Sequence, residues 1–372
     1  MISWRDPRPF DFLLLATALA LTAYGLLLIY SGSLNSSGSQ IADVLAGPAG
    51  RQLAFAMVGI CFCLVVSRLD YRFLAQGSVG LYFGLIGALV FVLLVGESEF
   101  GSKRWIDVGG TRVQPSEIGK LIVILALAKY LSDNSERVQD LRVFITSLVI
   151  AAVPALLVFA EPDLGSASIF LFVWLGMVIM AGADMRHVLG TVGMVLAIAP
   201  FALIIIVTEY QRDRVRLFLD PAADALGAGF NTIQAEISIG SGGLFGKGLT
   251  EGSQTQLDYL RTQTTDYVFS VLGEELGFIG AMVLFGLFIL LLFRGLRAAA
   301  ISQDIFGRMI AVGIVIFILL QTFINVGVNI RLFPVTGIPL PFISQGGSSL
   351  VTVFIAVGLL ESVIMRHRQV TL

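Results

Sequence analysis

The sequence predicts an all-α protein that crosses a membrane many times. Hydrophobic residues make up 56% of the 372 residues and charged residues only 13%, far from the balance of a soluble domain. Ten apolar runs are each long enough to cross a hydrocarbon core of about 30 Å, which takes roughly 20 helical residues. We therefore expect a single transmembrane domain over residues 1–372, with about ten transmembrane helices and one large extracytoplasmic loop, 208–265, between helices 7 and 8.

The ten apolar runs follow one another with short polar connections, apart from that loop. They cover residues 10–31, 51–67, 73–96, 115–131, 141–160, 164–182, 187–207, 266–293, 305–330 and 343–365. The first run exceeds twenty residues and has no clear small-residue cleavage site close behind it. We therefore expect it to stay in the mature chain as a span, because a signal peptide has a shorter apolar core.

The basic residues predict the orientation, because ten spans place both termini on one side. Thirteen of them lie in the termini and in the loops after spans 2, 4, 6 and 8: Arg5, Arg8, Arg68, Arg72, Lys129, Arg137, Arg142, Arg186, Arg294, Arg297, Arg308, Arg366 and Arg368. The short loops on the other side carry only Arg51, Lys103, Arg104, Arg112 and Arg331. Lys and Arg are enriched in cytoplasmic loops, so both termini should be cytoplasmic and the long loop should face outward.

The composition argues against several classes of chemistry. Cys61 and Cys63 lie inside the second span with no partner cluster, which predicts neither a disulfide framework nor a metal site. His187 and His367 are the only histidines and are far apart in sequence, which argues against histidine-based zinc chemistry or a Ser-His-Asp triad. The net charge is −2 with no basic tract, so nucleic acid is not an expected partner. Acid or base catalysis must then fall to carboxylates.

Polar residues at membrane depth are costly, so their clusters indicate cavities or buried sites. In GSKRWIDVGGTRVQPSEIGK, 101–120, a glycine-rich outer loop leads into a helix that begins at Pro115. Glu117 and Lys120 are three residues apart and share a helix face. They form either a structural ion pair at the mouth of a span or part of a substrate cavity.

A second cluster, FAEPDLGSAS at 159–168, is a very short outer turn between two apolar spans. Pro162 ends one helix, and the side chain of Asp163 can cap the next. Capping explains Asp163 without any catalytic role, although the residue could also face a cavity. Capping assigns no role to Glu161.

Two further segments carry glycine, proline and basic residues. In the long loop, Arg212, Arg214 and Lys247 accompany the glycine-rich GSGGLFG and amphipathic stretches. Such a backbone beside cations suits a diphosphate, although interfacial arginines also bind phospholipid headgroups. In NVGVNIRLFPVTGIPLPFISQGGSSL, 325–350, three prolines predict a non-helical hairpin dipping into the protein, after which Ser348 and Ser349 open the last helix.

The eighth span begins with TTDYVFSVLGEELG, residues 264–277. On a continuous helix, Ser270, Gly273 and Gly277 would lie within about 40° of Asp266 and Glu275 would point the opposite way. Glu274 would be the acid closer to the Asp266 face. Asp266 would extend roughly 13 Å beyond the glutamates, at headgroup depth. It could serve as a general base for a hydroxyl on a membrane-anchored substrate, or it could simply cap the helix.

Six segments in order resemble the SEDS family (shape, elongation, division and sporulation proteins), which includes RodA, FtsW and SpoVE. They read KRWIDVGGTRVQPSEIGK, EPDLGSA, YQRDRVRLFLDP, GSGGLFGKG, TTDYVFSVLGEELGFIG and PVTGIPLPFISQGGSS. The PVTGIPLPF stretch is most similar to the RodA branch. The chain departs from the family where Glu161 replaces a common glutamine, where Gln345 replaces a tyrosine, and where RTQTTDY replaces a PExHTDF motif whose aspartate aligns with Asp266.

The resemblance implies a peptidoglycan glycosyltransferase of the bacterial cytoplasmic membrane that polymerises lipid II on the outer face during cell elongation. In that reading Asp266 is the general base, and transfer to the N-acetylglucosamine 4-hydroxyl inverts the anomeric carbon. The candidate substrate contacts are Arg51, Lys103, Arg104, Arg212, Arg214, Lys247, Ser348 and Ser349. A divalent cation, Mg²⁺ or Mn²⁺, could assist at the diphosphate. Glu117, Lys120, Asp163 and Glu274 would support the cavity.

Two other functions compete with this one. A lipid II flippase would share the substrate but needs a polar path across the whole membrane, whereas the polar residues here gather at the outer ends of the spans. A non-catalytic scaffold would hold and activate a partner. The resemblance implies that partner to be a class B penicillin-binding protein, a transpeptidase, with spans 8 and 9 as docking helices among the membrane lipids.

Overall fold

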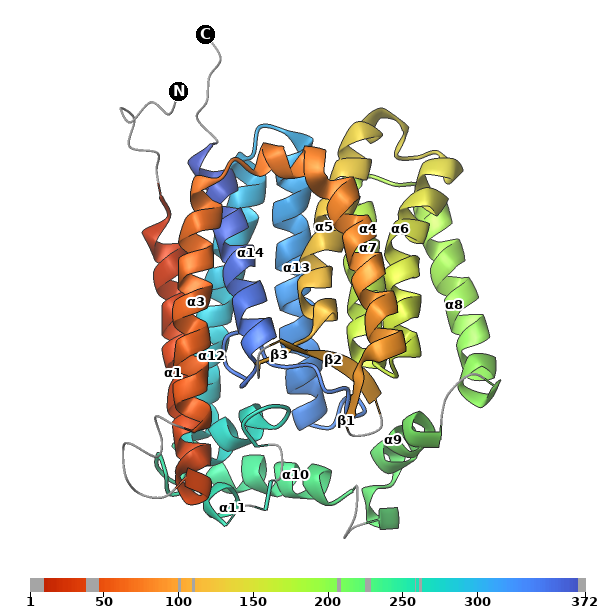
Figure 1. Ribbon diagram of the computed structural model, residues 1–372. Coiled ribbons are helices and arrows are strands. Elements are labelled where there is room, and N and C mark those ends of the chain that lie inside the picture. Colours follow the sequence, from red (N-terminus) through yellow and green to blue (C-terminus); the bar gives the residue numbers. More distant parts are fainter. Residues whose placement is uncertain are drawn as a thin grey trace.

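The computed structural model describes residues 10–37, 47–99, 102–108, 111–205, 209–224, 229–257, 259–260 and 263–366, which form a bundle of long helices (Figure 1). Ten long helices match the ten predicted spans in order: α1 (Phe12–Ser37), α3 (Pro48–Arg68), α4 (Tyr71–Val95), α5 (Pro115–Asp133), α6 (Leu141–Ala160), α7 (Leu164–Ala181), α8 (Met185–Ile205), α12 (Val268–Ile301), α13 (Ile305–Asn329) and α14 (Gly347–Met365). The all-α prediction is confirmed.

The chain is a polytopic membrane protein. Among the described residues, eight of these helices are long and apolar enough to cross a membrane. The other two are α5, which carries Glu117, Lys120, Lys129 and Asp133 within its 19 residues, and α8, which qualifies only as a shorter apolar helix over Met185–Ile198. Two of these charged residues, Glu117 and Lys120, pair with each other inside the bundle.

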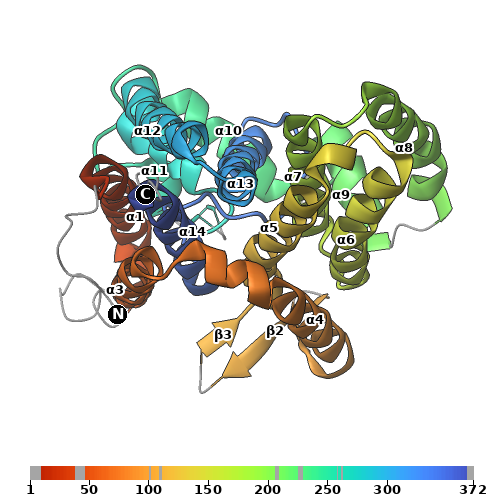
Figure 2. The same cartoon turned by 90° about the horizontal axis from the view of Figure 1, so that it is seen from above.

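Helices α13 and α14 form the centre of the bundle (Figure 2). In their most apolar stretches 78% and 83% of the residues are buried, against 22% in α3 and in α4, which therefore lie at the periphery. A glycine allows the closest approach between α14 and α3, because a Cβ on Gly358 would lie 2.7 Å from the Cys63 carbonyl oxygen. The apolar side chains that α3 and α4 expose suit contact with lipid.

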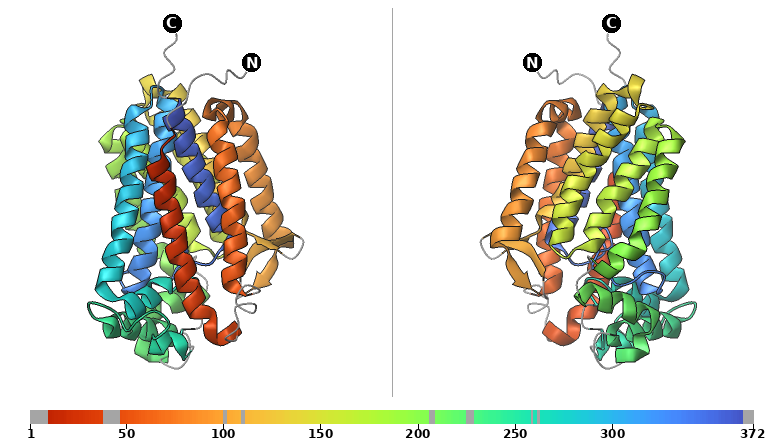
Figure 3. Two further views of the ribbon diagram at one scale, coloured as in Figure 1. Left: turned by 90° about the vertical axis from the view of Figure 1, so that its left-hand side faces the viewer. Right: turned by 90° about the vertical axis from the view of Figure 1, so that its right-hand side faces the viewer.

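A small sheet, which the sequence analysis did not anticipate, follows α4. Strands β1 (Glu97–Glu99), β2 (Ser102–Val108) and β3 (Thr111–Val113) pair antiparallel in the order β1-β2-β3. Ile106 faces Val113 in the register of β2 and β3. The sheet stands beside α4 at one end of the bundle (Figure 3). It gives Arg104, which was assigned to a loop, a fixed place on β2.

The segment between α8 and α12 covers one end of the bundle, which we call the distal end. It contains α9 (Glu209–Leu219), the 3-10 turn η2 (Pro221–Asp224), α10 (Phe230–Gly242) and the short α11 (Ser253–Gln256). The start of α1 and the end of α14 lie at the opposite end, the terminal end, where the 3-10 turn η1 (Ser135–Arg137) also lies (Figure 1). Helices therefore make up part of the long loop, for which the sequence predicts amphipathic stretches.

Helix α12 corrects the expectation of one continuous helix from residue 266. It begins at Val268, so Asp266 lies in the preceding turn, and its backbone leaves the helical region at Gly277, where φ is +63°. That conformation strongly favours glycine. The predicted polar face made of Asp266, Ser270, Gly273 and Gly277 therefore does not exist as one helical face.

The break in α12 is filled by the backbone of residues 242–248. The amides of Phe278 and Ile279 donate to the carbonyls of Gly243 and Leu244, both at 3.0 Å. In return, the carbonyls of Glu274 and Glu275 accept from the amides of Lys247 (2.9 Å) and Gly248 (3.0 Å). The glycine-rich loop thus replaces the hydrogen bonds that the helix loses, which an interrupted transmembrane helix requires.

Candidate active site at the distal end of the bundle

The backbone of Asp266 is held by two asparagines from the last turns of α13. Its carbonyl accepts from the side-chain amides of Asn329 (2.9 Å) and Asn325 (3.3 Å). The Asn329 Oδ1 atom in turn accepts from the amide and the hydroxyl of Ser270 (3.1 and 2.7 Å). These polar groups are nearly all buried and paired, so they fix the turn before α12 rigidly.

The carboxylate of Asp266 is left available for chemistry. The residue is partly exposed, and within the described part of the chain its carboxylate makes no hydrogen bond or ion pair. It does not cap α12, because Tyr267 occupies the N-cap without a side-chain bond. Burial raises the pKa of Asp266 from 3.8 to about 6; Asp163 adds to the rise, whereas Arg214 and Arg104 oppose it.

Arg104 connects β2 to the turn between α6 and α7. Its Nε atom donates to the carbonyl of Glu161 at 3.2 Å, and its Nη2 atom donates to the carbonyl of Pro162. Its Nη1 atom lies 3.7 Å from Oδ2 of Asp163. The Arg104 side chain is only 12% exposed, so the guanidinium is fixed where its charge also acts on Asp266.

Asp163 combines the two roles that the sequence left open. Its Oδ1 atom accepts from the amide of Ser166 at 3.0 Å, so it caps α7 as predicted. Its Oδ2 atom accepts from the side-chain amide of Gln114 at 3.3 Å and faces Arg104. The cap therefore also joins the group of charges around Asp266.

Arg214 reaches this group from α9. It is half-buried, and its Nη1 atom donates to the carbonyl of Val335 at 2.8 Å. Arg212 is exposed on the same helix, and Arg51 is exposed in the first turn of α3. The side chain of Lys103 lies outside the described part of the chain. The roles of Arg51, Lys103 and Arg212 thus stay predictions.

The segment between α13 and α14 dips into the protein, as predicted, and supports the Asp266 turn. Its residues Ile338, Leu340, Phe342 and Ile343 are buried. The hydroxyl of Ser344 donates to the carbonyl of Thr265 at 2.6 Å, and the amide of Gln345 donates to the carbonyl of Thr264 at 2.8 Å.

The start of α14 is linked to Asp163 through Gln114. The hydroxyl of Ser348 accepts from the Gln114 amide at 3.1 Å, and Gln114 contacts Asp163 through its side chain. Ser349 is 7% exposed. The structure therefore brings Ser348 into the network around Asp163.

Glu117 and Lys120 form the ion pair that the sequence suggested, and the pair is buried. The Nζ atom of Lys120 lies 2.6 Å from Oε1 of Glu117, and both residues are 2% exposed. Lys120 also lies over the ring of Phe317 on α13, 5.6 Å from its centroid. The pair lies within the first two turns of α5, just after its N-cap Gln114, so it braces the helix start that presents Gln114 to Asp163.

Glu274 anchors the distal segment. Its carboxylate is fully buried and accepts from Lys247 Nζ (2.7 Å), from the amides of Gln254 and Thr255 (2.9 and 3.1 Å) and from the Thr255 hydroxyl (2.9 Å). Lys247, predicted as a diphosphate contact, is thus engaged by Glu274. The neighbouring Glu275 accepts from the hydroxyl of Ser31 on α1 at 2.5 Å.

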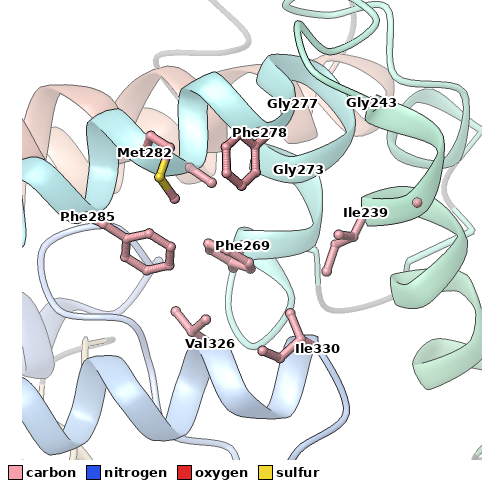
Figure 4. Close-up of a pocket in the computed structure, with 12 residues that line it drawn as sticks. Ile239, Gly243, Phe269, Gly273, Gly277, Phe278, Met282, Phe285, Val326 and Ile330 are labelled. Carbon is pink, nitrogen blue, oxygen red and sulfur yellow. The ribbon is translucent and has the colours of Figure 1, made fainter.

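A separate pocket of about 310 Å³ lies between α10, α12 and α13 (Figure 4). Phe269, Phe278, Met282, Phe285 and Val326 point into it or line its rim, and Gly273 and Gly277 form part of its wall. Its surface is apolar, so it offers no groups for acid–base chemistry. It contains none of the predicted site residues.

The site thus brings together Asp266, Asp163, Arg104 and Arg214 from four separate parts of the chain. Asn325, Asn329 and Gln114 were not among the predicted site residues. A signal was present for the asparagines, because two amides four residues apart near the end of an apolar span share a helix face.

Comparisons with known proteins agree with this picture. A family model for FtsW, RodA and SpoVE, described as a cell cycle protein, matches residues 11–369. The chain is 37% identical over 358 residues to a probable peptidoglycan glycosyltransferase FtsW of Trichlorobacter lovleyi, covering 95% of this chain and 93% of the relative. It is 37% identical over 364 residues to the peptidoglycan glycosyltransferase MrdB of Escherichia coli, covering 98% and 95%.

A solved structure shares the fold along nearly the whole chain. It is described as "Structural coordination of polymerization and crosslinking by a peptidoglycan synthase complex". The similar chain in it gives a TM-score of 0.81 at 29% identity and covers 97% of this chain and 99% of its own length.

Proposed function

The chain belongs to the SEDS family of FtsW, RodA and SpoVE, whose relatives above are peptidoglycan glycosyltransferases, and we propose that it polymerises glycan strands from lipid II with Asp266 as the general base. The distal end would face outward, as the distribution of basic residues predicts. The observation that carries the proposal is the Asp266 carboxylate: fixed through its backbone, unpaired among the described residues, and flanked by two arginines.

In the proposed reaction, the 4-hydroxyl oxygen of the acceptor N-acetylglucosamine attacks the anomeric carbon of the donor sugar. The hydroxyl proton moves to Asp266 as the new glycosidic bond forms. The bond from the anomeric carbon to the diphosphate breaks, and undecaprenyl diphosphate leaves with the electron pair. A single displacement of this kind inverts the anomeric carbon, so the base and the leaving group lie on opposite faces of the sugar.

The pKa of about 6 suits Asp266 for this role. A base with a pKa just below the working pH is ionised and still holds a proton well in the transition state. The partial burial that raises the pKa of Asp266 also lowers the local dielectric constant, which strengthens the electrostatic interactions of the carboxylate.

Arg214 and Arg104 are the proposed stabilisers of the diphosphate. Both act electrostatically on Asp266, so they lie near the reacting groups. Arg104 also faces the carboxylate of Asp163, and Arg214 also donates to the backbone carbonyl of Val335. Charge placed in advance beside a leaving diphosphate lowers the barrier most effectively where water is scarce. We retain Arg51, Lys103, Arg212 and the Ser348–Ser349 pair as further proposed contacts along the path of the substrate.

A divalent cation is a further proposal. The described residues contain no group of three or more His, Cys, Asp or Glu side chains that could hold a metal by themselves. Asp163 and Asp266 could instead supply one or two oxygens while the diphosphate and water complete the shell, which is how Mg²⁺ is usually bound. If such an ion is needed, adding a chelator to the assay should abolish activity and Mg²⁺ or Mn²⁺ should restore it.

The proposed base is tested by polymerisation of lipid II in liposomes with Asp266→Asn. Wild type should form long glycan strands on a gel, and the Asn variant should lose about 10²–10⁴-fold in rate, the usual contribution of a general base. Asp133→Asn, at the exposed ion pair near the terminal end of α5, is the matched control and should stay active. Undiminished polymer from Asp266→Asn would refute the base. Lipid II transport without polymer from wild type would favour the flippase.

We also propose that the partner is a class B penicillin-binding protein that docks on α12 and α13. The solved relative comes from a complex that couples polymerisation to crosslinking, and the apolar pocket between α12 and α13 suits a membrane segment. The assay above should therefore include this transpeptidase.

The FtsW and MrdB relatives are equally similar to this chain, so overall identity does not distinguish division from elongation. We propose a role in elongation because the PVTGIPLPF stretch is most similar to the RodA branch. Expressed with its partner in rod-shaped bacteria depleted of their elongation polymerase, the chain should restore rods. Rescue only of cells depleted of their division polymerase would contradict this role.

A further inference from the structure

Four buried polar atoms on the neighbouring helices α5 and α13 have no hydrogen-bond partner among the described residues. They are Oγ of Ser116, Oε2 of Glu117, and both Oε1 and Nε2 of Gln321. Ser116 and Gln321 are fully buried, and Glu117 is 2% exposed. Unpaired polar atoms inside a protein are costly and rare, so each of these atoms calls for an explanation.

The packing of α5 against α13 has a register that can be followed turn by turn. The two helices lie side by side (Figure 2). A Cβ atom on Gly313 of α13 would lie 2.6 Å from Cγ2 of Ile124 on α5. One turn further along α13, the ring of Phe317 lies 5.6 Å from Nζ of Lys120. The chain number thus rises by four on α13 while it falls by four on α5, so the helices are antiparallel.

One further turn toward the distal end brings in the polar side chains. Gln321 is four residues beyond Phe317 and lies within about 40° of it around α13. On α5, Glu117 and Ser116 are three and four residues before Lys120, one turn in the same direction. Gln321 therefore lies opposite the turn that holds Ser116 and Glu117, and the four unpaired atoms share one buried region.

The chemistry of these atoms fits water. Glu117 Oε2 and Gln321 Oε1 accept hydrogen bonds, the Gln321 amide donates them, and the Ser116 hydroxyl does either. Their ligand must therefore both donate and accept, as a buried water does with about three polar partners. A cation fits poorly, because Lys120 Nζ already lies 2.6 Å from Glu117 Oε1 and the hydrogens of the Gln321 amide would repel it.

We propose that Ser116, Glu117 and Gln321 hold a buried water between α5 and α13, and that through this water Gln321 acts as a positioning residue for glycosyl transfer. The positioning role rests on the proposed function. The water site itself does not, because it follows from the hydrogen-bonding needs of three buried side chains.

The water would join the two helices that support the two halves of the active site. On α13, Gln321 lies one turn before Asn325, which donates to the carbonyl of Asp266. The first turn of α5 follows Gln114, which donates to the carboxylate of Asp163. A bridge between these helices fixes the distance from the proposed base to the Asp163 side of the site, where a displacement of about 1 Å is enough to slow the reaction.

The water is tested by a density map of the full chain in lipid nanodiscs, at a resolution that shows ordered water. Wild type should show a water at about 2.7–3.2 Å from at least two of the three side chains. Gln321→Met, which keeps the length of the side chain without its polar atoms, should lose this water. Direct contact of Gln321 with Ser116 or Glu117, with no water between them, would overturn the site.

A double-mutant cycle tests the same site without a map. If Gln321 and Ser116 share one water, Gln321→Met and Ser116→Ala should together shift the thermal unfolding midpoint by less than the sum of their separate shifts. Gln321→Met and Thr22→Val should add, because the Thr22 hydroxyl donates within α1, to the carbonyl of Ala18 at 2.8 Å. Additive shifts for Gln321 and Ser116 would overturn the shared water.

The positioning role is tested by steady-state polymerisation of lipid II in liposomes. Gln321→Met should lower kcat by roughly tenfold with a smaller change in KM, because a misplaced base slows the chemical step more than binding. Gln321→Asn, which keeps an amide able to reach the water, should recover most of kcat. Thr22→Val, which removes a buried hydroxyl in α1, should keep the wild-type kcat.

The outcomes distinguish this inference from the proposed function. A wild-type water together with an unchanged kcat in Gln321→Met would overturn the positioning role. Equal losses of kcat in Gln321→Met and Thr22→Val would also overturn it. Full activity in Asp266→Asn would overturn the proposed base, whereas the density map would still decide the water site, because it does not depend on the reaction.

Discussion

At the scale of single residues, Asn329 shows how a neutral side chain can hold the proposed base in place. Its Oδ1 atom accepts twice from Ser270, while its Nδ2 atom donates to the carbonyls of Asp266 and Asn325. An amide suits this position because it supplies both donors and an acceptor in one plane. The residue therefore fixes the place of Asp266 without lowering the basicity of its carboxylate through an added charge.

Asn329→Asp should consequently slow glycosyl transfer. The new oxygen would face the Asp266 carbonyl in place of a donor, and the turn would shift. We expect kcat to fall by roughly ten- to a hundredfold with a smaller change in KM, since a displacement of about 1 Å can cost that much. Steady-state polymerisation measures this effect. Asn134→Asp, at the terminal end of α5, is the control, and equal losses in both variants would contradict the positional argument.

At the scale of elements, the break in α12 connects the bundle to the distal segment. The loop 242–248 supplies four backbone hydrogen bonds at the break, and the Glu274 carboxylate binds the next stretch, 247–255. A Cβ atom on Gly277 would lie 2.3 Å from the Gly246 nitrogen. The position thus needs glycine both for its positive φ and for this close approach.

Gly277→Ala should therefore destabilise the protein by about 1–3 kcal/mol or more, from the strained φ and from the clash. Thermal unfolding in detergent should show a lower midpoint. Gly286→Ala is the matched control in the same helix, because nothing lies within 4 Å of its Cβ position and alanine favours helix. Equal midpoints for the two variants would mean that the break is not strained.

At the scale of the whole molecule, the terminal end of the bundle holds ion pairs between helices, whereas the distal end holds a carboxylate without an ion pair among the described residues. At the terminal end, Asp11 pairs with Arg294 on α12, and its amide donates to Glu361 on α14 at 3.0 Å. Arg366 lies 3.4 Å from Asp70. These contacts tie α1, α3, α12 and α14 together. At the distal end, by contrast, the Asp266 carboxylate is unpaired among the described residues, which suits a site that receives a ligand.

The sequence by itself determined the helical spans and pointed to Asp266 as the proposed base. Apolar runs about 20 residues long have one stable solution in lipid, the helix, because its backbone groups are all satisfied internally. The ten predicted runs accordingly match ten helices. The sequence also predicted that Asp163 caps α7 and that Glu117 and Lys120 can pair, and both contacts are present. Both depend only on residues three positions apart.

Only the tertiary structure decided which of these residues meet. Asp266 is held by Asn329, 63 residues away, and Glu275 by Ser31, 244 residues away. The break at Gly277 depends on the loop 242–248, which lies far beyond the reach of helical periodicity. Likewise, Glu161 stayed unexplained in the sequence, because its burial and the place of Arg104 follow from the packing of β2 against the α6–α7 turn. Local pattern fixes elements, whereas contacts between distant segments fix the pKa values and the geometry of a site.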